Sequence, residues 1–149
     1  MQSPAQVREA LVRQWVESAH DDLAWAEMGA ASSELRGVAQ IGFHAQPAVE
    51  KLLKGLLTAH GVQPEEQHLL GRLVERLRLL DRATAASLPA LGLLTEYAVR
   101  YRYPPGAPGQ AHSLRKQDVL RDLETARKAC AILEAAIEHR LDALRKAGP

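Results

Sequence analysis

Residues 43–57 contain the side chains of this chain that are best arranged to do chemistry. On a helix with 100° between successive residues, the imidazole of His44 and the ammonium groups of Lys51 and Lys54 fall on one side, with Thr58. The opposite side is apolar and carries Ala45, Ala48, Val49, Leu52, Leu53 and Leu56. This pattern predicts a helix that buries one face and presents a basic face that can bind an anion. The alternative is a bundle helix whose charged face is simply solvated.

A second basic segment spans residues 97–117, in which no acidic residue occurs. Its charged and aromatic side chains include Arg100, Arg102, Tyr103, His112, Arg115 and Lys116. Guanidinium groups bind phosphate bidentately, and tyrosine rings can stack on bases. The segment therefore suits a nucleotide or an RNA strand. A solvated loop whose arginines cap the preceding helix would have the same composition.

The remaining polar residues do not form a pattern typical of an enzyme or a metal site. His68 follows a Pro-containing connection, where it could transfer a proton or orient the start of the next helix. The chain has no His-x-x-x-His pair, so we predict no metal. It has no Gly-rich phosphate-binding loop and no Gly-x-Ser-x-Gly turn, so we predict no cofactor and no nucleophilic serine.

Composition places the chain among single-domain helical proteins. Its 149 residues, 46% of them apolar, can bury a core, and the abundance of Ala, Leu, Glu and Arg favours helices. A net charge of +1 gives no global field that would attract nucleic acid or a membrane, so any basic site must be local. The single cysteine, Cys130, lies at an apolar helical position and is expected to be a packed thiol. Without a transmembrane-length apolar run or a signal peptide, we expect a cytoplasmic protein that does not enter the membrane.

Apolar residues recur at three- and four-residue spacing over five segments, which predicts an all-α bundle of four main helices and one shorter helix. The expected helices span Pro4–Ala31, Val38–His60, Glu66–Leu80, Leu88–Arg100 and a last segment from about Leu114. Pro47 should bend the second helix without dividing it, and Gly61 should end it. The apolar stripes expected to face the core include Val7, Leu11, Trp15, Ala19, Leu23 and Ala26, then Leu69, Leu70, Leu73, Leu77 and Leu80, and finally Val119, Leu123, Ala126, Cys130, Leu133, Ile137 and Leu144.

Several short motifs, in this order, resemble the HEPN family of small helical domains. The segment 19–26 is similar to the family's A-x-x-D-L-x-x-A, and residues 43–57 are similar to its F-H-A-Q-x-A-x-E-K-x-L-K helix. His68 matches the histidine that opens the next helix, and residues 102–104 match R-Y-P. The chain departs from the pattern in two places, because Pro47 replaces the usual glutamine and Leu70 stands near the position where an aspartate is common.

The resemblance implies a four-helix up-and-down bundle, residues 1–149 as one domain, a homodimer and a cleft with polar lining. Many members of the family are metal-independent RNases that use a closely spaced Arg–His pair near the last long helix. Others are non-catalytic partners of minimal nucleotidyltransferases. Nine residues intervene here between Arg102 and the next histidine, His112, so that motif is absent.

The absent motif favours a nucleotide- or RNA-binding partner of a minimal nucleotidyltransferase in a toxin–antitoxin-like pair. The predicted ligand contacts are His44, Lys51, Lys54, His68, Arg100, Arg102 and Tyr103. An endoribonuclease toxin that uses Arg102 and His112, and a purely structural dimerising bundle, remain the alternatives.

Overall fold

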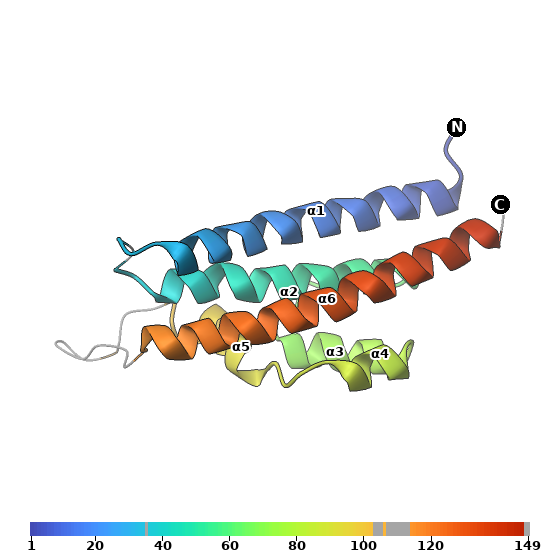
Figure 1. The fold of residues 1–149 in the computed structure, drawn as a ribbon. Coiled ribbons are helices and arrows are strands. Elements are labelled where there is room, and N and C mark those ends of the chain that lie inside the picture. Colours follow the sequence, from blue (N-terminus) through green and yellow to red (C-terminus); the bar gives the residue numbers. More distant parts are fainter. Residues whose placement is uncertain (35, 103–105, 107–113, 148–149) are drawn as a thin grey trace.

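Three long helices lie side by side in the computed structural model, which describes residues 1–34, 36–102, 106 and 114–147. They are α1 (Pro4–Ala31), α2 (Ala39–Ala59) and α6 (Lys116–Lys146). Helix α1 runs antiparallel to α2 and α6, so the two chain termini lie at one end of the bundle (Figure 1). The described residues contain no strand, which confirms the predicted all-α class.

Helix α2 is the central element, because it contacts α1, α3, α5 and α6. It continues through Pro47, as the in-phase apolar pattern on both sides of that residue predicted. Gly61 ends it with a φ of 82°, a left-handed conformation that favours glycine. The Val62 N–H donates to the Leu57 carbonyl at 3.0 Å and the Gly61 N–H donates to the Thr58 carbonyl at 2.9 Å, which together form a Schellman C-cap.

Three short helices, and not two, build the remaining side of the bundle: α3 (Leu70–Arg78), α4 (Arg82–Ser87) and α5 (Gly92–Val99). Helix α4 was not predicted. It begins because the Asp81 carboxylate accepts hydrogen bonds from the Thr84 N–H at 3.0 Å and from the Thr84 hydroxyl at 2.6 Å, which is an N-cap. The helix predicted over Glu66–Leu80 spans only Leu70–Arg78, so Leu69 and Leu80 lie outside it. Both are exposed, whereas both were expected to face the core.

The core lies between α1, α2, α6 and the short helices. Along α6, every predicted core position from Val119 to Ile137 is buried, and Leu144 is partly buried. Cys130 is buried, which confirms the predicted packed thiol, and this burial raises its pKa to about 12. Along α1 the prediction holds only in part: Ala19 and Ala26 are buried, but Val7 and Leu11 remain exposed.

Candidate functional site

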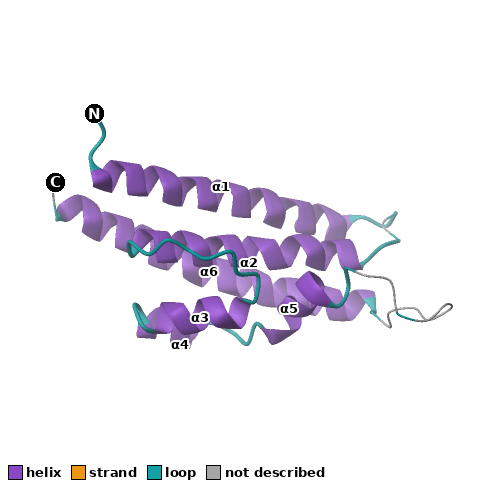
Figure 2. Ribbon diagram, turned by 180° about the vertical axis from the view of Figure 1, so that it is seen from behind, coloured by secondary structure: helices purple, strands orange, loops and turns teal. Residues whose placement is uncertain are grey.

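A buried carboxylate lies in the middle of the polar face of α2. Glu50 accepts hydrogen bonds from the Lys54 ammonium at 2.7 Å and from the Gln46 amide at 3.0 Å, and its Oε1 lies 3.0 Å from Nδ1 of His68. The connection between α2 and α3 runs back along α2 (Figure 2). His68 lies in this connection, and its contact with Glu50 places it at this point. Gln46 anchors it by donating a second hydrogen bond, 3.3 Å long, to the His68 carbonyl.

The surroundings of Glu50 keep its carboxylate ionised. Burial alone would raise the pKa of Glu50, but the hydrogen bonds from Lys54 and Gln46 outweigh burial and hold this pKa below its ordinary value. Lys54 is only 7% exposed, and its ammonium lies 5.7 Å from the centre of the Trp15 ring of α1, in a cation–π contact. The prediction that Lys54 lies on an open basic face is therefore wrong.

A second carboxylate organises the other basic residues of α2. Asp22 of α1 lies 3.2 Å from Nδ1 of His44 and accepts a 2.5 Å hydrogen bond from the ammonium of Lys51. On the outer side, the Trp25 ring stacks on His44, with ring centroids 6.1 Å apart and 26° between the ring planes. Both lysines of the predicted basic face are thus paired with carboxylates, one of them supplied by a different helix.

A group of cations without carboxylate partners lies at one end of the bundle. Helix α5 is held there because the Tyr97 ring packs against Gly42 of α2 and the Tyr97 hydroxyl donates to Asp122 of α6 at 2.7 Å. Tyr101 packs on Tyr97 with ring centroids 5.1 Å apart, and the Arg100 guanidinium lies 5.7 Å from the centre of the Tyr101 ring. Arg100 and Arg102 are both exposed.

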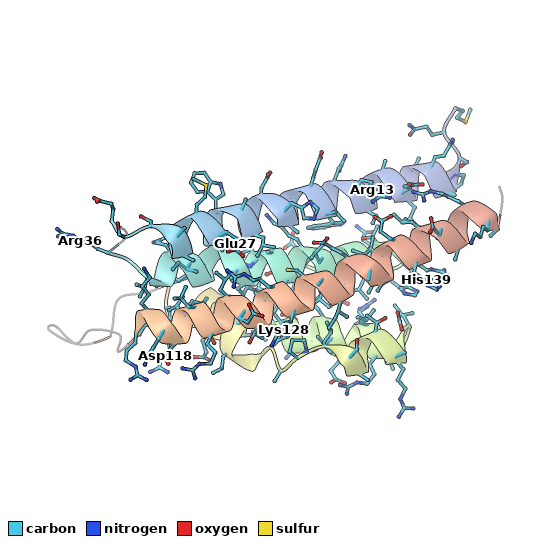
Figure 3. The ribbon with its side chains drawn as sticks, viewed as in Figure 1. Arg13, Glu27, Arg36, Asp118, Lys128 and His139 are labelled. Carbon is cyan, nitrogen blue, oxygen red and sulfur yellow. The ribbon has the colours of Figure 1, made fainter. Side chains whose placement is uncertain are left out.

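Two further cations lie at the same end. Arg36 lies in the connection between α1 and α2, and Figure 3 shows it reaching outward at this end of the molecule. Lys116, the first residue of α6, donates a 3.4 Å hydrogen bond to the Ser32 carbonyl at the end of α1. Within the described part of the chain, Arg36, Arg100, Arg102 and Lys116 form no ion pair with a carboxylate, whereas Arg115 and Arg121 both pair with Asp118. We call these four unpaired residues the cationic end.

The structure therefore distributes the predicted ligand contacts over three places. His44 and Lys51 lie with Asp22, Lys54 and His68 lie with Glu50, and the arginines of the predicted site lie at the cationic end. Gly42 marks that end on α2, and Lys54 follows it by twelve residues, or about 18 Å along the helix. Tyr103 and His112 fall outside the described residues, so the arrangement of the Arg102–His112 pair is not described.

Sequence reasoning missed a third polar cluster, where α2 ends beside α4 and α6. Burial and the positive charge of Arg140 lower the pKa of His60, while Asp81 acts in the opposite direction. His60 Nε2 and Arg140 Nε are buried and make no hydrogen bond to any described residue. The three residues are far apart in the sequence, and no short motif links them.

Metal-binding clusters and membrane-spanning helices are both absent from the described residues. In residues 1–34, 36–102, 106 and 114–147, no three His, Cys, Asp or Glu side chains are placed to hold a metal ion. In the same residues, no helix combines the length and the apolar character that crossing a membrane requires.

Comparison with known proteins adds the family. No curated protein and no solved structure matches the chain significantly. The family model described as "HEPN domain" matches residues 12–139, which include α2, the short helices and most of α1 and α6. The chain therefore belongs to the HEPN domain family.

Proposed function

We propose that this chain binds a nucleotide or RNA and that it acts in the cytoplasm as the partner of a minimal nucleotidyltransferase, in a toxin–antitoxin-like pair. Membership of the HEPN family supports a role connected with nucleotides or RNA. The pairing with a nucleotidyltransferase rests on the family resemblance and on the missing Arg–His motif after Arg102.

The observation that carries the binding role is the cationic end. Exposed arginines without carboxylate partners are free to form bidentate hydrogen bonds with phosphate oxygens. Lys51 and Lys54 would first have to leave Asp22 and Glu50, which makes them weaker phosphate ligands. Arg100 and Arg102 are therefore the principal phosphate contacts in our proposal. His44, Lys51, Lys54, His68 and Tyr103 remain predicted contacts.

A matched pair of double variants tests this proposal. Arg100→Ala/Arg102→Ala should weaken binding of a fluorescent 12-nucleotide single-stranded RNA at least tenfold at low salt, as measured by fluorescence anisotropy. Arg72→Ala/Arg82→Ala removes the same charge from exposed arginines of α3 and α4 and should bind as the wild type does. Equal losses in both variants would show that only net charge matters.

The RNase alternative has one observation in its favour. The His68 side chain is 72% exposed, while its Nδ1 contacts the buried carboxylate of Glu50, an arrangement that orients an imidazole for proton transfer. We expect little cleavage when the purified protein is incubated with total RNA in EDTA. Cleavage that His68→Ala or His112→Ala abolishes would make the toxin role the better one.

A further inference from the structure

Trp25 is a large aromatic residue that lies on the surface and does not contribute to the core. Its side chain is 59% exposed, and it is the only aromatic residue among the exposed large apolar side chains of the described chain. It belongs to the second half of α1, directly before the buried Ala26, so the helix directs its ring away from the core. One face of the Trp25 ring stacks on His44, which fixes the orientation of the ring.

His44 is itself held in position. Its Nδ1 lies 3.2 Å from Asp22, which also accepts a hydrogen bond from Lys51, and its side chain remains 38% exposed. The Trp25 and His44 rings are near-parallel and come from adjacent helices, so they form an aromatic surface whose geometry does not depend on a loop. Such a surface accepts a flat aromatic group at little entropic cost.

The surface lies near the cationic end. From Trp25 to Ser32 there are seven residues of α1 and its cap, or about 10 Å along the helix. Ser32 accepts the hydrogen bond from Lys116, and Arg36 follows in the same connection. Flat aromatic surface beside unpaired cations is the combination that binds single-stranded nucleic acid, in which bases stack on aromatic rings and phosphates lie on basic side chains.

We infer that Trp25, backed by His44, stacks on an unpaired base of a single-stranded RNA whose phosphates lie on the cationic end. This inference rests on the proposed function and identifies its ligand as an unpaired nucleobase within a strand, whose phosphates are spaced along the backbone. A free nucleotide has the same base, but its phosphates lie together at one end and cannot reach several separate cations, so it binds more weakly. Duplex RNA keeps its bases stacked within the helix and offers no base to Trp25.

Tryptophan fluorescence provides a direct readout, because the chain has two tryptophans and Trp15→Phe leaves Trp25 as the only one. A single-stranded 12-nucleotide RNA should quench Trp25 saturably, and ATP or a duplex of the same length should need at least tenfold higher concentration. Trp25→Leu should weaken binding about 5- to 150-fold, the usual cost of losing one base–aromatic stack. Trp25→Phe should retain most of the affinity, and Leu79→Ala, at an exposed apolar residue after α3, should retain all of it.

The outcomes separate this inference from the proposed function. If the RNA binds with an affinity that Arg100→Ala/Arg102→Ala reduces, but Trp25→Leu binds as the wild type does, the role of Trp25 is wrong and the proposed function stands. If Trp25→Phe loses as much affinity as Trp25→Leu, packing and not stacking explains the effect, and the inference again fails. If no form of RNA or nucleotide binds the wild type, both fail.

Discussion

The Tyr97 ring occupies the space that a side chain on Gly42 would need: a Cβ at position 42 would lie 2.1 Å from two carbon atoms of that ring. Tyr97 is fully buried, and its hydroxyl donates to Asp122. Burial and the Asp122 carboxylate both raise the pKa of Tyr97 well above its ordinary value, so it stays a protonated donor. Gly42 thus allows α5 to approach α2 and places Arg100 and Arg102 at the cationic end.

Gly42→Ala should therefore destabilise the protein, because the Tyr97 ring is enclosed and cannot move aside. Overpacking of this kind costs about 1–3 kcal/mol in the free energy of unfolding. Gly71→Ala is the matched control: no atom lies within 4 Å of a Cβ at position 71 in α3, so that change should leave stability equal or slightly higher. Urea unfolding followed by circular dichroism measures both, and equal stability of the two variants would contradict the close packing.

The Glu50–Lys54 pair should behave as a buried ion pair. Lys54→Met leaves the Glu50 carboxylate without its strongest partner and should cost about 3–5 kcal/mol in the free energy of unfolding. Adding Glu50→Gln removes the unpaired charge, so the double variant should cost less than the sum of the two single variants. A double-mutant cycle from chemical denaturation gives this coupling, and additive costs would show that the pair is effectively solvated.

Stability should fall as the pH is lowered below about 6.5, the ordinary pKa of an unfolded histidine. Burial and Arg140 lower the pKa of His60 in the folded protein, so the unfolded chain takes up a proton that the folded chain does not. The free energy of unfolding then rises with pH over this window. Denaturation at pH 7.5 and 5.5 should show a smaller loss for His60→Gln than for the wild type. An equal or steeper loss in His60→Gln would contradict the assignment.

We predict a homodimer, which light scattering should report as about twice the 16.3 kDa chain mass. The apolar stripe of α6 from Val119 to Ile137 is buried within the chain, so it is not available as an interface. We expect the exposed Val7 and Leu11 to form the interface instead, because they border a hollow of about 510 Å³ that Trp15, Val62 and Pro64 also line. Leu11→Asp should yield monomers and Met28→Asp should not. A wild-type mass of one chain at every concentration would remove this claim.

The long helices could be predicted because their apolar periodicity is continuous over several turns, as it is along α6. The short helices could not be placed accurately, because their limits depend on local details. A single N-cap at Asp81 starts α4, and the polar connection after Gly61 delays α3 until Leu70. The spacing of apolar residues predicts neither the start of α4 at its N-cap nor the late start of α3.

The polar residues of α2 could be identified from the sequence, but their surroundings could not. Asp22 and Trp15 come from α1, and His68 comes from the connection to α3, so the pairing of Lys51 and the burial of Lys54 result from contacts between distant segments. A helical wheel of one segment shows only its own residues. The His60–Arg140 cluster and the separation of Lys54 from the cationic end could not be predicted either, because they too depend on contacts between distant segments.

The most direct test of the account is the salt dependence of RNA binding. The Kd of the wild type for a labelled single-stranded 12-nucleotide RNA would be measured from 50 to 300 mM KCl, beside Arg100→Ala/Arg102→Ala. Phosphate contacts release counterions, so affinity should fall steeply with salt, and the slope of log K against log salt should be smaller by about 2 in the variant, or about 1 for each lost contact. No binding at 50 mM KCl, or equal slopes for the two proteins, would contradict the proposed function.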